Sequence, residues 1–269
     1  MLKQLFTILL ILLSSCKTFR QLVLPERKET APGGNAFYKQ IAAMKWNERE
    51  PMMLKEILSG NMPGSLKKLV PVHINIKDSS GEIITATYFV TPDYLSVGNN
   101  DDFARVPITP MTAQQIADSL HCFLPTRKMV NDIYTQARVK LEPLPLVAFR
   151  DSAATFYQHH LMIEGQRKNR GGLIAGIKKD VVISSKINND AKPDRVAIYG
   201  WHNPDAVPIQ PLYTGHINWY VDYSHGIRLV SRTIIVNGKK YDYTDLLKDE
   251  RLRKILCDEA DCSFYRYNY

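Results

Sequence analysis

The 269-residue chain contains no apolar run long enough to span a bilayer, no internal repeat and only four cysteines. A membrane-spanning helix needs about 20 consecutive apolar residues, and the apolar run at residues 5–13 is too short for one. The glycine-rich segment 171–176 lacks both the strand–loop–helix context and the Lys-Ser/Thr ending of a phosphate-binding loop. These absences exclude a spanning helix in the first residues, a repeat architecture and a P-loop nucleotide site.

The chain also has no acidic excess. Its 35 lysines and arginines outnumber its 27 aspartates and glutamates, which gives a formal net charge of +8 at pH 7. Such a balance fits an anionic partner, or alternatively a modest excess of solvated lysines. Apolar residues make up 45% of the chain, which is typical of a globular protein. Without a signal segment about 250 residues would remain, enough for one substantial core or two small ones.

Residues 1–16 have the pattern of an export signal. Lys3 supplies a positive start, residues 5–13 form an apolar segment, and Leu13-Ser14-Ser15-Cys16 ends it with small residues before a cysteine. This ending resembles the lipobox of bacterial lipoproteins, which implies that Cys16 becomes the lipidated first residue of the mature chain. An ordinary signal peptide is the alternative. No acidic run follows Cys16, so we expect a lipid-anchored protein of the bacterial cell envelope that faces the periplasm.

That location narrows the partners. Nucleic acid is not expected in the envelope, whereas anionic cell-wall polymer, acidic glycan and lipid headgroups are available there. We therefore expect a cell-wall or polysaccharide substrate, and contact with the membrane through the lipid on Cys16.

The three remaining cysteines predict one disulfide and one free thiol. Cys257 and Cys262 are close enough in the sequence for a local disulfide in an oxidising compartment. Because no second pair exists, their spacing is weak evidence for zinc. Cys122 is left over and is either buried and inert or a reactive thiol.

Composition and periodicity predict an α+β fold, in which N-terminal helices and a β-hairpin precede a β-rich C-terminal half with a terminal helix. Residues 17–35 contain clustered proline, glycine and charge and predict a flexible tether that lifts the domain off the membrane. The remainder is divided into an N-terminal α+β lobe, residues 36–142, and a β-rich C-terminal lobe, residues 143–269, that carries the expected site. The sequence leaves open whether these are two domains or two lobes of one.

Local patterns place the individual elements. Helical patterns are found at residues 36–58, at 112–120 after a capping box, and from 126 onward. A β-hairpin is predicted from residues 70–77 and 82–91. The strands expected in the second half are residues 181–185, 196–201, 217–222, 227–236 and 240–243, followed by an amphipathic segment capped at 244–245.

The second half also concentrates side chains suited to catalysis. These side chains are His202, Asp205, His216, Asp222, Ser224, His225 and Arg228. The segment 223–226 lies at an expected break between two strands, where Gly226 would permit a backbone conformation closed to other residues. Functional side chains are common on connections held by a rigid sheet. Two histidines at neighbouring strand ends can therefore face one cleft.

Residues 224–229 resemble the Ser-His-Gly-Cys-x-Arg signature of L,D-transpeptidases, β-rich envelope enzymes that form an acyl-enzyme on peptidoglycan through a cysteine. Four residues match this signature: Ser224, His225, Gly226 and Arg228. The resemblance implies that His202 is equivalent to an upstream histidine of that family and that Arg228 lies near substrate carboxylate or backbone. The nucleophilic cysteine is absent, as if deleted between Gly226 and Ile227, so the chain cannot run the family's thiol chemistry. As a whole, the chain also resembles other secreted bacterial proteins, which implies no activity.

One chemistry open to these residues is acyl or glycan hydrolysis by general acid–base catalysis. His225 or His202 would act as the base, Asp222 or Asp205 would orient it, and Arg228 would bind an anionic group. Adjacent residues on an extended chain point in opposite directions, so Ser224 is a nucleophile only if a histidine other than His225 reaches it.

Two other chemistries remain. Cys122 could act as a nucleophile with a distant histidine, in the order found in papain-like peptidoglycan amidases. No cofactor is predicted, although a zinc site formed by His202, His216 and His225 is not excluded.

Aromatic residues surround the cluster, and Trp201 and Tyr223 join His216 as expected substrate contacts. Aromatic side chains at alternating strand positions commonly pack in a core, whereas at a cleft they would form a platform on which sugars stack. Our hypothesis from the sequence is a lipid-anchored hydrolase, or a transpeptidase-like enzyme, that acts on a cell-wall polymer, with peptidoglycan first and acidic polysaccharide second. The rival hypothesis is a non-catalytic lipoprotein that binds glycan or a partner.

Overall fold

The structure is a computed structural model that describes residues 18–269. It is a mixed α+β fold, as the sequence predicted. The helices are η1 Thr18–Arg20, α2 Gly34–Gln40, α3 Trp46–Leu58, α4 Gly64–Lys67, α5 Pro110–Ser119, α6 Arg127–Gln136, α7 Ala153–Arg167, η2 Ser185–Ile187, α8 Tyr243–Lys248 and η3 Arg253–Ile255. The strands are β1 Val70–Lys77, β2 Ile83–Val90, β3 Ser96–Gly98, β4 Phe103–Arg105, β5 Cys122–Phe123, β6 Val139–Lys140, β7 Ile174–Ala175, β8 Lys179–Val182, β9 Arg195–His202, β10 Pro208–Ile217, β11 His225–Gly226, β12 Val230–Ser231, β13 Thr233–Val236 and β14 Lys239–Asp242.

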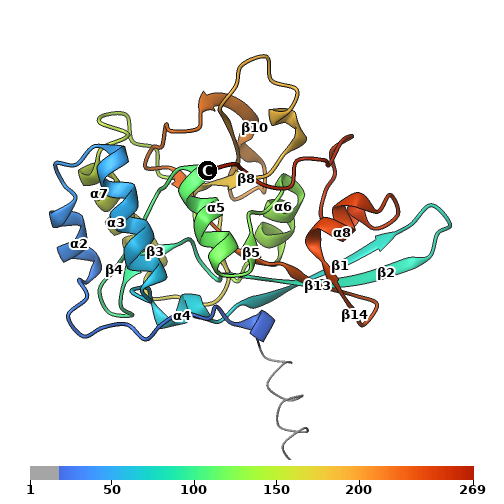
Figure 1. Ribbon diagram of the computed structural model, residues 1–269, viewed down its shortest axis with the longest axis horizontal. Coiled ribbons are helices and arrows are strands. Elements are labelled where there is room, and N and C mark those ends of the chain that lie inside the picture. The colour runs from blue at the N-terminus through green and yellow to red at the C-terminus, as the bar shows by residue number, and fades with distance from the viewer. Residues whose placement is uncertain (1–17) are drawn as a thin grey trace, which may run out of the picture.

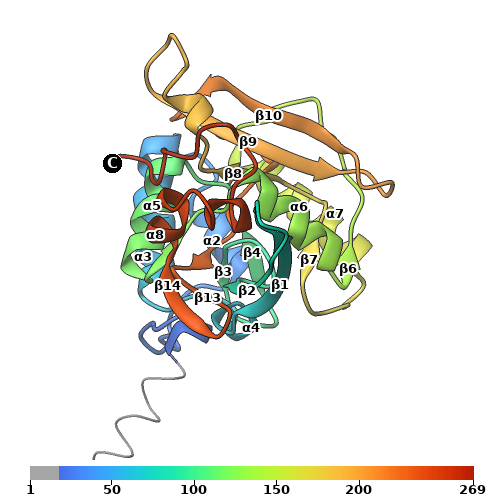
Figure 2. The same ribbon diagram turned by 90° about the vertical axis from the view of Figure 1, so that its right-hand side faces the viewer.

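Two sheets organise the described part of the chain. The larger sheet has the order β14–β13–β2–β12–β5, with β1 also paired to β2. The smaller sheet has the order β10–β9–β8–β11, and its edge strand β11 runs parallel to β8. Figure 1 shows α2, α3 and α7 at the end of the molecule opposite the β1–β2 hairpin. In Figure 2 the β8–β9–β10 sheet lies across the top, away from β13 and β14.

The two lobes expected from the sequence share one sheet and one core. Strand β2, from the N-terminal half, pairs with both β12 and β13 from the C-terminal half. The main cluster of buried apolar residues extends from Leu22 to Tyr267. Residue 142 therefore does not separate two independent cores.

The segment predicted to be a flexible tether packs against the domain from Thr18 onward. Gln21 forms a β-bridge with Lys68, and Leu22 is buried with 2% of its surface exposed. Further along, Arg27 donates a hydrogen bond from Nε to Asn61 Oδ1 at 2.8 Å. Backbone pairing and apolar burial outweigh the proline- and charge-rich composition on which the tether was predicted.

Most early elements lie where the sequence predicted them. The hairpin pairs Val70 with Val90 and Lys77 with Ile83, as its alternating pattern indicated. Helix α5 begins earlier than predicted, because Thr109 is the N-cap and accepts from the backbone N–H of Thr112. The predicted capping box at 112–115 was therefore wrong.

The second half departs further from the predictions. Residues 218–224 form no strand, because β10 occupies 208–217 and the chain then turns. The expected strand 227–236 is divided between β12 and β13, and helix α7 was not foreseen. Within residues 18–269, no helix combines the length and apolar character needed to cross a bilayer.

The cysteines are arranged as one bridge and one buried thiol. A disulfide joins Cys257 and Cys262, whose Cα atoms are 6.3 Å apart, as predicted. Cys122 lies on β5 with 1% of its surface exposed, and burial raises the pKa of its thiol to about 12. A thiol that stays protonated at neutral pH is a poor nucleophile. The reading of Cys122 as a catalytic residue is therefore wrong for this fold.

Candidate functional site

The candidate site is built around Asp222, in the connection between β10 and β11. Its carboxylate is 1% exposed and accepts hydrogen bonds from the backbone N–H and the hydroxyl of Ser224. Arg150 donates to the other carboxylate oxygen at 2.8 Å. Burial alone favours the neutral acid, but nearby His225, the hydrogen bonds from Ser224 and the charge of Lys179 hold the pKa of Asp222 below its ordinary value. The site therefore contains a fixed negative charge at neutral pH.

His225 lies on the short strand β11, which pairs with Lys179 of β8. Its Nε2 is 3.9 Å from Asp222 Oδ1, too far for a hydrogen bond, and has no hydrogen-bond partner among residues 18–269. Burial lowers the pKa of His225 to about 4, against the opposing charge of Asp222. The imidazole is thus neutral at pH 7, and with 1% of its surface exposed it cannot reach a bulk substrate directly.

His216, near the end of β10, is the more accessible imidazole. Its ring centroid is 6.0 Å from that of His225 and 4.8 Å from that of Tyr220. Burial lowers the pKa of His216, while the charge of Asp222 opposes the shift. A neutral imidazole that is half-buried at the surface can accept a proton from water.

A surface pocket of about 280 Å³ collects these groups from four parts of the chain. Its walls are Arg150, Lys179, Gln210, Tyr213, His216, Tyr220 and Asp222. Lys179 Nζ lies 5.0 Å over the Trp201 ring, and burial lowers its pKa while Asp222 opposes the shift. Arg150 remains cationic, since Asp222 and nearby tyrosines outweigh the burial that would lower its pKa. The pocket presents one neutral base and a carboxylate flanked by two basic side chains.

His202 does not join this pocket. It is 2% exposed, its ring stacks on Tyr134 with centroids 4.4 Å apart, and its Nε2 contacts Asn131 Oδ1 at 3.0 Å. In the β9–β10 ladder His202 pairs with Pro208, whereas His216 pairs with Val196. Six residues along a strand span roughly 20 Å. The two histidines therefore lie far apart along the β9–β10 ladder, and His202 packs against helix α6.

Arg228 lies in the core rather than at the site. Its guanidinium donates to the carbonyl oxygens of Thr91 and Ile174, both at 2.6 Å, and lies 4.5 Å over the Tyr94 ring. It is 1% exposed and 3.8 Å from Asp180. The expectation that Arg228 binds substrate is therefore wrong, because its guanidinium is buried and is surrounded by protein groups.

The aromatic residues expected to contact substrate are also packing residues. Trp201 is 6% exposed and Tyr223 is 1% exposed. The Tyr223 hydroxyl donates to the carbonyl oxygen of Leu146 and accepts from its backbone N–H. Ser224 is fully buried and gives its hydroxyl hydrogen to Asp222, so it is not positioned as a nucleophile.

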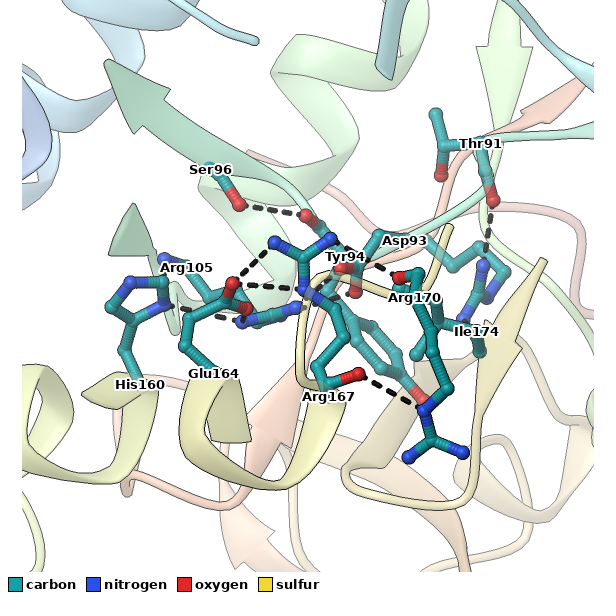
Figure 3. Close-up of polar contacts among 11 residues, drawn as sticks. Thr91, Asp93, Tyr94, Ser96, Arg105, His160, Glu164, Arg167, Arg170 and Ile174 are labelled. Carbon is teal, nitrogen blue, oxygen red and sulfur yellow. Dashed lines mark hydrogen bonds and ion pairs between the residues drawn. The ribbon is translucent and has the colours of Figure 1, made fainter. Parts of the chain in front are cut away.

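A second polar cluster, which the sequence did not reveal, lies between α7 and the β3–β4 pair. Arg105 contacts the carboxylates of Asp93 and Glu164 and the ring nitrogen of His160 (Figure 3). Glu164 also pairs with Arg167 on the same helix. Arg105 is 1% exposed, so its charge is fully paired by protein. This cluster fixes α7 against β4 and leaves no group of Arg105 free for a ligand.

Among residues 18–269, no three histidine, cysteine or carboxylate side chains gather closely enough to hold a metal ion. The zinc alternative required His202 beside His216 and His225, and the ladder places His202 elsewhere.

Sequence reasoning missed Arg150, Lys179, Gln210, Tyr213 and Tyr220 as parts of the site. Lys179 offered one signal, since it directly precedes an apolar run that forms a strand. Arg150 and Gln210 offered none, because only the tertiary fold brings them to Asp222. No protein-family model, curated protein or solved structure matches this chain.

Proposed function

We propose that the chain is a hydrolase that cleaves an acyl bond in an anionic polymer of the cell envelope, with peptidoglycan as the first substrate and acidic polysaccharide as the second. One observation carries the proposal. The neutral imidazole of His216 opens into the same pocket as the ionised Asp222 and the cations Arg150 and Lys179.

The pocket can activate water without a protein nucleophile. His216 takes a proton from a water molecule as its oxygen attacks the carbonyl carbon of the substrate. Lys179 and Arg150 stabilise the negative charge that develops on the carbonyl oxygen, and Asp222 holds Arg150 in place through the 2.8 Å ion pair. The imidazolium then returns its proton to the leaving nitrogen or oxygen. His225 is buried with its ring centroid 6.0 Å from that of His216 and 6.3 Å from that of Tyr220, so it supports these rings and does not meet the substrate.

Acyl cleavage fits the pocket better than glycoside cleavage does. Most glycosidases use two carboxyl groups that flank the scissile bond. Asp222 is the one carboxylate among the pocket walls described above, and it is committed to Ser224 and Arg150. The basic side chains also suit the carboxylates carried by peptidoglycan stems or uronic acids.

The test is His216→Ala assayed on purified peptidoglycan, with released products identified by mass spectrometry. The variant is expected to lose at least about 100-fold in kcat/KM, since a general base commonly contributes that much. His73→Ala is the matched control, because its imidazole is exposed on β1 and forms a ring hydrogen bond with Thr87, away from the pocket walls. The hydrolase proposal fails if His216→Ala and His73→Ala have equal turnover with unchanged melting temperatures.

The second candidate function is a non-catalytic binding lipoprotein. It is favoured by the burial of His225 and Ser224, which leaves the pocket with no nucleophile of its own. Retention of the wild-type protein on cell-wall or polysaccharide substrates without new products would support binding alone.

The lipid anchor is part of the same proposal, and Cys16 lies outside the described residues. The Cys16→Ser variant should no longer be found in the membrane fraction, and it should not be labelled with a fatty-acid analogue. Continued labelling of that variant would contradict lipidation at Cys16.

A further inference from the structure

A second pocket adjoins the proposed catalytic pocket and has a different character. Its volume is about 360 Å³, and it lies between the α2–α3 connection, the start of α7 and the segment after β10. Tyr220 lines both pockets, and Asp151 of this pocket is adjacent in sequence to Arg150 of the other. The two pockets therefore form neighbouring parts of one surface.

Two exposed tryptophans form one wall of this second pocket. Trp46 begins α3 and Trp219 follows β10, and their rings stack with centroids 6.2 Å apart and planes 16° from parallel. They remain 37% and 45% exposed, whereas Trp201 is buried. Stacking covers one face of each indole and leaves apolar ring surface open to solvent. Exposed, pre-ordered indoles of this kind are unusual outside binding sites.

The lining of this second pocket also contains polar groups that would orient a ligand. Arg49 lines the pocket with only 4% of its surface exposed, and its Nε has no hydrogen-bond partner among residues 18–269. Its Nη1 donates to the carbonyl oxygen of Asp151 at 2.8 Å, which fixes the side chain. Arg49 belongs to the pocket lining, so its guanidinium supplies hydrogen-bond donors to a ligand that carries acceptor oxygens. Ser152 and Asn47 add further polar groups to the lining.

We infer that this second pocket binds an amino-sugar ring, such as the N-acetylhexosamine units of a glycan strand. The apolar C–H face of the ring would stack on the tryptophans, and its hydroxyl or acetamido oxygens would accept from Arg49. The assignment to the glycan of the cleaved polymer rests on the proposed function, because a substrate that spans both pockets would present its acyl bond to His216. Sugar binding itself stands on the tryptophan pair and on Arg49, and it can be measured without turnover.

The experiment is titration of the purified protein with chitotetraose, followed by tryptophan fluorescence and calorimetry. Trp46→Ala and Trp219→Ala should each weaken binding at least 10-fold. Phe149→Ala is the matched control, because this aromatic residue is 82% exposed and lines neither pocket.

Two outcomes would overturn the inference. One is the absence of any saturable signal with the wild-type protein up to about 10 mM chitotetraose, a concentration at which even a site with a Kd of about 1 mM is nearly filled. The other is equal binding by Trp46→Ala, Trp219→Ala and the Phe149→Ala control. Tryptophan-dependent binding by a protein that releases no peptidoglycan products would sustain the sugar site while the hydrolase proposal fails.

An independent observation concerns the opposite end of the molecule, where the described chain begins. Three exposed cations lie there, and none of them has an ion-pair partner among residues 18–269: Arg20, Lys68 and Lys240. Lys240 Nζ lies 4.9 Å over the Phe19 ring, Arg20 lies over the same ring, and Lys68 bridges to Gln21. In Figures 1 and 2 strand β14 and the first described residues, which carry this basic face, lie away from strand β10.

We propose that this basic face rests on an anionic phospholipid surface. Cys16 precedes Thr18 by two residues, and two residues span at most about 7 Å. A lipid on Cys16 would therefore hold the face against the bilayer, and the pocket on β10 would point away from it. Unpaired lysine and arginine side chains near a membrane surface each strengthen attachment to anionic lipid.

The test is co-sedimentation of residues 17–269, which include every described element, with vesicles of phosphatidylglycerol and phosphatidylethanolamine. Binding should fall in about 0.5 M NaCl, where the screening length is only a few ångströms. The double variant Lys68→Glu/Lys240→Glu should reduce the bound fraction at least 10-fold. Lys192→Glu, an exposed lysine in the loop before β9, is the matched control. Equal binding to phosphatidylcholine vesicles, equal loss in the control or no binding at all would each refute the proposal.

Discussion

Gly226 lies between the buried His225 and the buried Ile227, and a methyl group added there has no room. A Cβ at this position would approach Tyr94 Cδ1 to 2.6 Å and Lys178 Cβ to 2.7 Å. Tyr94 and Lys178 are 2% and 1% exposed, so neither can retreat into solvent. Gly226→Ala must therefore displace a core side chain or the strand β11 itself.

The cost follows from overpacking, which destabilises well-packed cores by about 1–3 kcal/mol. Because two buried neighbours are affected, we expect the destabilisation by Gly226→Ala to lie near the upper end of this range. For a chain of this size 1 kcal/mol shifts the melting temperature by about 2–4 °C, so the variant should melt roughly 6–12 °C below wild type. Differential scanning calorimetry at neutral pH measures the shift.

Gly165→Ala is the matched control. Gly165 lies in α7, and a Cβ there would meet no atom within 4 Å. Replacing an unhindered helical glycine should stabilise the protein by about 0.5–1 kcal/mol, or about 1–4 °C. If Gly226→Ala melts with or above the wild type while Gly165→Ala behaves as expected, the close packing around β11 is not as described.

Three further predictions concern the cysteines and the buried imidazole. Cys122 should resist thiol reagents in the folded protein and react only after unfolding in guanidinium, a result that labelling kinetics can check. Replacing both Cys257 and Cys262 by serine should cost about 2 kcal/mol in urea denaturation, because the bridge closes only a short loop. His225, with its pKa lowered to about 4, stays neutral when folded but takes up a proton near pH 6.5 when unfolded. Its contribution to the free energy of unfolding is therefore present above pH 6.5 and is lost as the pH falls toward 4, by at most about 3 kcal/mol. Between pH 7 and pH 4.5 the free energy of unfolding of His225→Asn should therefore fall by less than that of the wild type.

Local signals predicted the parts of the fold that local physics determines. The hairpin β1–β2 follows from alternation and a turn, the start of α6 from the Thr126 cap, and the disulfide from the spacing of Cys257 and Cys262. Each of these features depends on residues close together in the sequence. The α+β class could be predicted for the same reason.

The errors arise where a residue's partner is distant in the sequence. Helix α7 has Ser152 as an ordinary N-cap, but its buried face includes polar His159 and His160, which weakens the apolar period that would have revealed it. His202 and His216 are close along the chain, yet an antiparallel pairing with bulges separates them. Arg150 reaches Asp222 across 72 residues. No pattern of neighbouring residues in the sequence predicts which of these distant side chains meet in the fold.

The Asp222-to-Arg228 element shows how a catalytic-looking motif can be explained by packing while still marking a site. Ser224 closes a turn on Asp222, Gly226 allows Tyr94 to approach the backbone, and Arg228 satisfies carbonyl groups in the core. None of these three roles requires a substrate, which also removes the need for the missing cysteine. What the element supplies to the pocket is the carboxylate of Asp222, held at a fixed position. That carboxylate orients Arg150 beside His216, so the reactive groups come from outside the motif while the motif determines where they meet.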